Sequence, residues 1–295
     1  MGLPMMIDPK VALAGLFVGF VVGLTGMGGG ALMTPILVLL FKVQPLAAVS
    51  SDIVASMIMK PVGGGVHWRR GTVNTELVKW LVLGSVPSAF LGVLLLKSTG
   101  QGDALQHHVK IALGIALLVV ALGLIIRPLL SRGRQGDSIE PLVVKKAQTV
   151  LIGIAGGLVV GLTSVGSGSL MIILLLMLYP KLRLSELVGT DLVQAIPLVA
   201  SAALGHALFG DFQLALTASI LIGSVPGVFI GAQLSSRARD AVIRPALILV
   251  LLASSLKLLG SSNVVLALVL AGFAGAYFAV RATEQRNARL ALKLR

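Results

Sequence analysis

Nine long apolar segments follow one another along this chain, and they constrain its fold more than any other feature. They cover residues 11–41, 46–66, 80–96, 109–126, 148–178, 187–209, 212–234, 242–260 and 263–280. An α-helix needs about 20 apolar residues to cross the ~30 Å hydrocarbon core of a bilayer. Charged residues make up only 12% of the chain, against roughly 25% in a soluble domain. The sequence therefore predicts an all-α, polytopic transmembrane helix bundle in the cell membrane, which for a bacterium means a multi-pass inner-membrane protein.

The charge pattern and the missing residue types exclude several functional classes. The net charge is +13, but the basic residues lie in loops between apolar segments, as the positive-inside rule requires, so we expect no nucleic-acid partner. Cysteine is absent, which excludes disulfides and thiolate metal sites. No zinc-protease helix, nucleophile elbow or phosphate loop is present, so we expect neither an enzyme, a metal site nor a cofactor. Segment 11–41 is too long for the apolar core of a signal peptide and is kept as structure.

An internal repeat divides the chain into two similar halves. At a separation of 138 and then 139 residues, identical residues coincide, including Gly19/Gly157, Gly23/Gly161, Asp52/Asp191, His67/His206 and the tetrapeptides that begin at Gly84 and Gly223. Shared membrane composition would align Leu and Val, but would not hold Gly, Pro, Asp and His in one register. We therefore expect an extracytoplasmic leader (1–10), a first repeat (11–126), a cytoplasmic basic linker (127–147), a second repeat (148–260), and a final transmembrane helix with a basic cytoplasmic tail (261–295).

The first segment of each repeat is interrupted near its middle by glycines, at Gly26–Gly30 and at Gly166–Gly168. One continuous helix over 11–41 would be about 46 Å long, whereas each arm alone would reach only about 20 Å. Each segment is therefore either one broken crossing or a re-entrant hairpin.

The loop charges favour the hairpin. If each broken segment returns to its starting side, one face holds only Lys10, Lys42, Lys97 and Lys110, and the other holds 18 of the 22 basic residues outside the membrane. A single crossing would give a nearly even split. Each repeat then has three full crossings, so the second repeat is inverted relative to the first, as in many secondary transporters. This topology places the N-terminus outside and the C-terminus in the cytoplasm.

The two glycine-rich breaks are the predicted substrate site. Irregular backbone is tolerated in lipid only where protein or a water-filled cavity satisfies its polar groups. The helix N-terminus after each break would present free N–H groups and the positive end of its dipole, which suits a small anion. The alternative is that these glycines only allow close helix packing. The candidate substrate-binding residues are Thr25, Gly28, Gly29, Gly30, Thr163, Ser164, Gly166, Ser167, Gly168, Ser169 and Gln194.

Several ionisable residues lie inside the apolar segments, where burial is costly enough to suggest function. Asp52 and Asp191 are candidates for proton coupling; because each follows Ser or Thr, they are also candidates for helix N-caps. Lys60 lies two turns after Asp52 and would attract anions or neutralise that carboxylate. His67 and His206 end matched helices, as gates or as interfacial residues. Ser51 and Thr190 are further polar candidates.

In these residues the chain resembles the sulfite exporter TauE/SafE family, a family of sulfonate-uptake type permeases. The resemblance rests on Gly23–Pro35, Gly161–Met171, the helix starts at Ser51 and Gly189, the His67–Gly71 loop and the duplicated Gly-Ser-Val-Pro. It implies a transporter of sulfite, sulfonates or related organic anions. The Ser-Asp and Thr-Asp pairs depart from the Thr-Ser common in the family, which favours a protonatable site over a plain sulfite site.

The sequence alone leaves several functions open. A secondary transporter working by alternating access, with proton coupling as one option, is the leading hypothesis. A passive anion channel has the same pocket chemistry, and a membrane scaffold or sensor would neither bind nor move an anion. The expected partners are a small anionic substrate and the lipid bilayer, and a homo-oligomer is left open.

Overall fold

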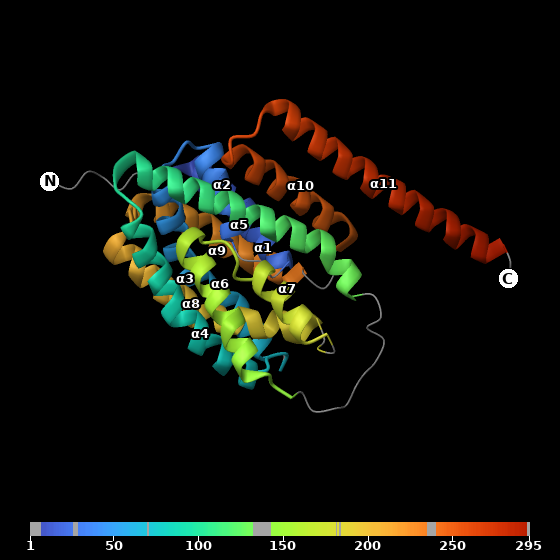
Figure 1. Ribbon diagram of the computed structural model, residues 1–295, viewed down its shortest axis with the longest axis horizontal. Helices are drawn as coiled ribbons and strands as arrows, with labels where there is room; N and C mark the ends of the chain where they lie inside the picture. The colour runs from blue at the N-terminus through green and yellow to red at the C-terminus, as the bar shows by residue number, and fades with distance from the viewer. Residues whose placement is uncertain are drawn as a thin grey trace.

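The structure is a computed structural model, and it describes residues 7–25, 29–69, 71–131, 143–180, 182, 184–234 and 240–293. In these ranges the chain forms α-helices and no strand (Figure 1). The helices are α1 (Pro9–Thr25), α2 (Gly30–Leu39), α3 (Pro45–Arg69), α4 (Thr75–Ser98), α5 (Gly102–Ser131), α6 (Lys146–Thr163), α7 (Ser169–Leu178), α8 (Leu184–Phe209), α9 (Leu214–Leu234), α10 (Asp240–Leu258) and α11 (Asn263–Lys293). The predicted all-α membrane bundle is confirmed.

Six of the described helices, α3, α4, α5, α6, α8 and α9, are long and apolar enough to cross a membrane. Some helices begin earlier than hydropathy alone predicted. α4 starts at Thr75 rather than at residue 80, because Asn74 caps it by accepting a 3.0 Å hydrogen bond from the Leu77 N–H. A polar first turn of this kind is not detected from hydropathy, because its residues are not apolar.

The second broken segment folds into a hairpin, α6–α7. Tyr179, just after α7, accepts a 2.9 Å hydrogen bond from the Lys145 N–H and lies 2.5 Å from the Thr149 hydroxyl at the start of α6. The chain therefore returns to the end of the hairpin from which it set out.

The first broken segment, α1–α2, returns in the same way. The Asp8 N–H, just before α1, donates to Ser219 Oγ at 2.9 Å, and the Gln213 N–H donates to Ser51 Oγ of α3 at 3.3 Å. The starts of α1 and α3 thus both lie beside the start of α9. The two arms are unequal, with 17 and 10 residues in α1 and α2, or about 26 and 15 Å. The expected equal arms of about 20 Å were wrong, because α1 begins ahead of the apolar run.

Helices of one repeat pack against helices of the other repeat. α1 of the first repeat packs on α9 of the second, and α6, the counterpart of α1, packs on α4 of the first (Figure 1). A Cβ on Gly15 would lie 2.8 Å from the Ile220 carbonyl oxygen, and a Cβ on Gly19 would overlap the Ser224 backbone. The matched Gly153 and Gly157 meet Leu81 and Ser85 in the same register. Glycine is required at these positions because the helix backbones touch.

The counterpart helices α3 and α8 run antiparallel. Ser50, near the start of α3, bonds to His206 near the end of α8, while a Cβ on Gly64, near the end of α3, would meet Ile196 at 3.0 Å. In matched positions the Gln213 N–H donates to Ser51 Oγ and the Asn74 N–H donates to Thr190 Oγ1. Antiparallel counterparts are the relation that inverted repeats require.

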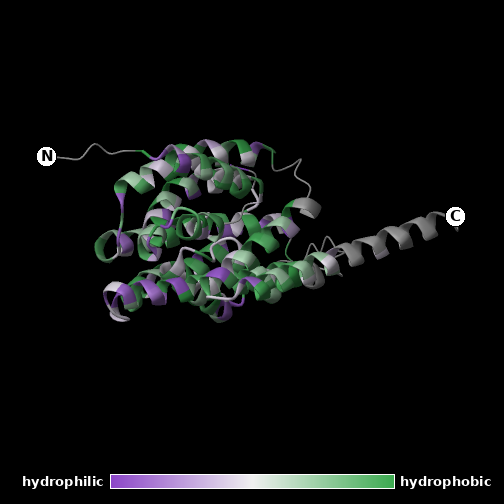
Figure 2. Cartoon of the chain, turned by 90° about the horizontal axis from the view of Figure 1, so that it is seen from above, coloured by the Kyte–Doolittle hydropathy of each residue, from purple (hydrophilic) through white to green (hydrophobic). Residues whose placement is uncertain are grey.

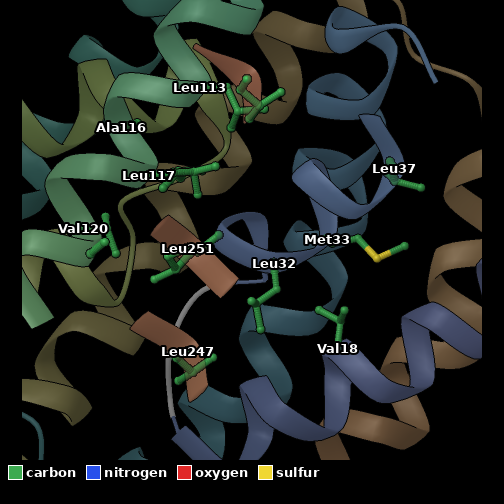
Figure 3. Packing of buried hydrophobic residues seen from close by; sticks show 14 of the residues in the cluster. Val18, Leu32, Met33, Leu37, Leu113, Ala116, Leu117, Val120, Leu247 and Leu251 are labelled. Atoms are coloured by element: carbon green, nitrogen blue, oxygen red, sulfur yellow. The ribbon is translucent and has the colours of Figure 1, made fainter. Parts of the chain in front are cut away.

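The short helices α2 and α7 are enclosed by other helices. Figure 3 shows α2 among α1, α5 and α10 through Leu32, Met33, Leu37, Val18, Leu113, Leu117, Leu247 and Leu251. α7 buries Met171, Ile172 and Leu175 in a second cluster. Because α2 and α7 bury most of their residues against protein instead of lipid, irregular backbone next to them is tolerated at membrane depth.

Many large apolar side chains point out of the bundle, as a lipid-facing surface requires, and hydrophobic residues predominate along much of the helices (Figure 2). Leu13, Leu83 and Leu214 point outward with 59–68% exposure. α11 lies along the edge of the bundle and packs on α10 (Figure 1). Its first turns are also apolar and exposed, with Val264 and Leu268 each 68% exposed.

Candidate functional site: the junction of the two helix breaks

The second break is a defined turn. Ser164, Gly166 and Gly168 have positive φ angles of 62°, 125° and 111°, which is why glycine is used twice within three residues. The Thr163 hydroxyl donates to the Val159 carbonyl at 2.6 Å and accepts from the Val165 N–H at 3.1 Å. Gly168 is the N-cap of α7 and provides no side-chain cap. The Met171 N–H donates to the Gly166 carbonyl at 3.2 Å, which leaves the amides of Ser169 and Leu170 as the ones in the first turn of α7 that have no intrahelical acceptor.

The first break begins after Thr25, whose hydroxyl donates to the Val21 carbonyl at 2.8 Å. Gly28 lies outside the described residues. Gly29 is the N-cap of α2 and likewise provides no side-chain cap. A Cβ on Gly30 would overlap the Ser164 carbonyl oxygen. The two breaks, predicted from the sequence to form one site, are therefore in direct contact.

Asp52 connects the two breaks. It is 1% exposed, and its Oδ2 accepts hydrogen bonds from Thr34 Oγ1 of α2 at 3.1 Å and from Ser164 Oγ at 2.5 Å. A Cβ on Gly29 would lie 3.9 Å from Asp52 Oδ1. The carboxylate thus lies beside the N-terminus of α2.

Asp191 has the corresponding place at the second break. Its Oδ1 accepts a 2.9 Å hydrogen bond from Gln194 Nε2, and the Gly168 backbone amide is a further hydrogen-bonding neighbour. Gln194 in turn accepts a 3.2 Å hydrogen bond from Ser85 of α4. Asp191 Oδ2 is buried without a hydrogen-bond partner among the described residues.

Neither aspartate is a helix N-cap. α3 begins at Pro45 and α8 at Leu184, so Asp52 and Asp191 lie about two turns inside their helices. The capping alternative, based on the Ser-Asp and Thr-Asp pairs, was wrong because both helices begin well before those pairs.

Lys60 is the positive charge at this junction. Asp52, Ser56 and Lys60 recur every four residues, so they share one face of α3, and Lys60 is only 6% exposed. Its charge acts on both Asp52 and Asp191. Its Nζ has no hydrogen-bond partner among the described residues. Among the described residues, Lys60 is thus a buried positive charge that interacts electrostatically with two buried carboxylates and makes a hydrogen bond to neither.

His206 lies inside the protein, at one end of this arrangement. Its Nδ1 is 2.9 Å from Ser50 Oγ, and its Nε2 is 2.8 Å from the Gly161 carbonyl oxygen. A carbonyl can only accept, so Nε2 carries the hydrogen and Nδ1 accepts from the Ser50 hydroxyl. His206 is therefore enclosed by neighbouring helices near the end of α8, and its predicted role as a gate or an interfacial residue stays a prediction. The side chain of His67 lies outside the described residues.

Ser51 and Thr190 are near the carboxylates in sequence but have other partners. They accept hydrogen bonds from Gln213 and Asn74, at 3.3 and 3.0 Å. They tie α3 and α8 to neighbouring connections. Ser167 and Ser169 are buried in the second break, each 4% exposed.

Sequence reasoning missed two hydroxyls at the site, those of Thr34 and Ser85. Ser85 belongs to the duplicated Gly84–Pro87 tetrapeptide, so its recurrence in both repeats could have marked it as a candidate. Thr34 precedes Pro35 in the middle of an apolar segment, and nothing local distinguishes it.

The arrangement combines features suited to a small anion. Two helix N-termini without side-chain caps, α2 and α7, lie at the breaks, and Lys60 lies between the halves. Such groups favour negative charge. A carboxylate in such a site can exchange a proton, because a buried ionised carboxylate is costly and neutralises readily.

Comparisons with known proteins identify the family. No solved structure matches the chain. A probable membrane transporter protein of Bacillus subtilis, YjnA, is 42% identical over 253 residues, which are 85% of this chain and 99% of that protein. A second, YdhB, is 25% identical over 81% of this chain and 95% of its own length. Residues 11–258 match the sulfite exporter TauE/SafE family. The chain therefore belongs to the sulfite exporter TauE/SafE family and is a multi-pass membrane transporter.

Proposed function

We propose that this protein is a secondary transporter for small sulfur-containing oxyanions of the sulfite and sulfonate type. The observation that carries the proposal is the buried Lys60 Nζ, which lacks a hydrogen-bond partner among the described residues and lies on the face of α3 that also carries Asp52, the residue that connects the two helix breaks. A buried ammonium group without a partner is costly, and an anion bound there would offset that cost.

The chemistry of the breaks fits an oxyanion. Leu32 and Met33 of α2 and Met171 of α7 already donate to carbonyls of the breaks, so the amides that lie ahead of them in the first turn of each helix are the ones that can donate hydrogen bonds to the oxygens of a ligand. The hydroxyls of Ser164, Ser167 and Ser169 add donors on one side of the site. The family description names sulfite, and a sulfonate group presents the same kind of oxygen-bearing sulfur. The site lies too deep for direct entry, because Asp52, Lys60 and Asp191 are all buried.

Alternating access is the mechanism that the fold supports. The counterpart helices α3 and α8 run antiparallel, and the connections that close the two ends are matched but unequal. One end is held by Ser50, His206 and Gly161, and the other by Asn74 and Thr190. In the proposed inverted topology these ends face outside and cytoplasm respectively, and opening one while the other stays closed would carry the anion across. A buried carboxylate supplies a route to proton coupling.

The test is flux through purified protein in liposomes. Labelled sulfite and a panel of sulfonates are added outside, and uptake is followed with unlabelled anion inside and without it. A carrier gives faster uptake with unlabelled anion inside, whereas a passive channel cannot accumulate label above equilibrium. Lys60→Met is expected to abolish uptake, and Lys79→Met, at an exposed position of α4, serves as the matched control. No flux of any of these anions through the wild-type protein would refute the proposal.

A further inference from the structure

The three buried charges of the site are not equivalent, and their hydrogen bonds separate the two carboxylates. Asp52 Oδ2 accepts from Thr34 and from Ser164, which come from the two halves of the molecule. Hydrogen bonds from two hydroxyls stabilise an ionised carboxylate and fix its position. Asp52 therefore braces the two breaks against each other.

Asp191 is held on one oxygen only. Its Oδ1 accepts from Gln194 at 2.9 Å, while Oδ2 is fully buried and has no hydrogen-bond partner among the described residues. The Lys60 ammonium group, whose charge acts on Asp191, is likewise buried and has no hydrogen-bond partner among the described residues. A buried carboxylate oxygen without a donor is the one that gains most from carrying a proton.

The position of Asp191 is also the position predicted for the substrate. Its carboxylate interacts with the Gly168 backbone amide at the start of α7, a helix of 10 residues without a side-chain cap. It shares the positive charge of Lys60, on the facing helix α3. An ionised Asp191 therefore uses the same donors as a bound oxyanion would use.

Resting on the proposed function, we infer that Asp191 is the coupling residue and that its ionised carboxylate competes with the substrate oxyanion for Lys60 and the α7 N-terminus. When a proton from solution forms an O–H bond on Asp191 Oδ2, the carboxyl group becomes neutral and no longer repels an anion. A sulfonate can then bind to Lys60. When the sulfonate leaves, Asp191 releases the proton on the same side, and its negative charge again acts on Lys60.

The charges in this cycle determine how many protons accompany each transported anion. In the empty site Lys60, Asp52 and Asp191 sum to one negative charge. With Asp191 protonated and one monovalent sulfonate bound, the sum is again one negative charge. One proton therefore accompanies each monovalent anion, and the transport is electroneutral.

Of the three groups that act on Asp191, Lys60 carries a charge, whereas Gln194 and the Gly168 amide are neutral. From α3 Asp191 faces Lys60, from the start of α7 the neutral Gly168 amide, and from its own helix the neutral Gln194 amide. From α4, the Ser85 hydroxyl bonds to Gln194 at 3.2 Å. His206 lies at the far end of α8, with both ring nitrogens bonded.

The experiment uses the full chain in liposomes with labelled methanesulfonate, which stays a monovalent anion at any working pH, and a pH-sensitive dye inside. In the wild type an inward proton gradient should drive accumulation, with one proton per sulfonate and no response to an imposed membrane potential. Asp191→Asn should still exchange methanesulfonate but lose the proton drive. Its affinity near neutral pH should rise by about tenfold and become independent of pH, because the competing charge is gone.

Two further variants make the assignment specific. Asp191→Glu should retain proton drive. Asp52→Asn, the matched carboxylate, should lower thermal stability but keep the proton drive. Proton-driven accumulation in Asp191→Asn, loss of that drive in Asp52→Asn alone, or wild-type uptake that responds to membrane potential would each overturn the inference. Absence of wild-type flux for sulfite and all sulfonates would instead overturn the proposed function itself, and the inference with it.

Discussion

Ser164, in the helix break of the second repeat, donates a 2.5 Å hydrogen bond from its hydroxyl to Oδ2 of Asp52 in α3 of the first repeat. Both side chains are buried. Ser164 adopts a positive φ of 62°, a conformation that costs a non-glycine residue energy. The bond thus joins the two halves of the molecule where their breaks meet, at the expense of some backbone strain.

Removing this hydroxyl should destabilise the protein in a way that depends on the replacement. Ser164→Ala is expected to lower the free energy of unfolding by about 1–3 kcal/mol, because a buried charged acceptor loses a donor. Ser164→Gly loses the same hydroxyl but suits the positive φ, so it should be the less destabilising of the two. Chemical unfolding in detergent micelles measures both. Thr34→Val, which removes the other hydroxyl donor to Asp52, is the control, and equal stability of the Ala and Gly variants would contradict the account.

Local chemistry explains which parts of this structure could be predicted from the sequence. The lengths of the apolar segments predicted the helices, and the glycine clusters predicted the helix breaks, because both are properties of neighbouring residues. The meeting of Gly30 with Ser164 and the bonding of Asp52 depend on residues more than 100 positions apart, which no local pattern specifies. The same limit explains His206. Its position at a helix end suggested an interface, while its bonds to Ser50 and Gly161 come from two other helices.

The glycines that line the contacts of α1 with α9 and of α6 with α4 should not tolerate even a methyl group. In Gly19→Ala the new Cβ would overlap the backbone of Ser224, and in Gly157→Ala that of Ser85. Backbone cannot move aside as a side chain can, so each variant is expected to lose about 1–3 kcal/mol of stability or more. Thermal denaturation in detergent, followed by loss of the monodisperse protein, measures this. Gly272→Ala on α11, where no atom lies within 4 Å of the new Cβ, should leave the midpoint almost unchanged; equal losses at all three sites would contradict the proposed packing role.

His206 should matter for stability through its two hydrogen bonds. His206→Phe keeps an aromatic ring of similar size but removes both bonds, which leaves the Gly161 carbonyl and the Ser50 hydroxyl without this partner. The expected cost is about 2–5 kcal/mol, since each buried group left unsatisfied costs about 1–3 kcal/mol. The same thermal assay measures it. His107→Phe, at an exposed position of α5, provides the background, and a His206 variant as stable as this control would show that the bonds contribute little.

The hairpin geometry makes a prediction about membrane sidedness. Because Tyr179 bonds to Lys145 and Thr149, the start of α6 and the end of α7 belong to one side of the membrane. Single cysteines replacing Lys145 and Ser185 should therefore react with a membrane-impermeant maleimide from the same side, and a cysteine replacing Lys42 from the opposite side. All three positions are exposed, and the native chain has no cysteine to interfere. If segment 148–178 instead crossed the membrane once, the first two cysteines would react from opposite sides, and the second repeat would not be inverted.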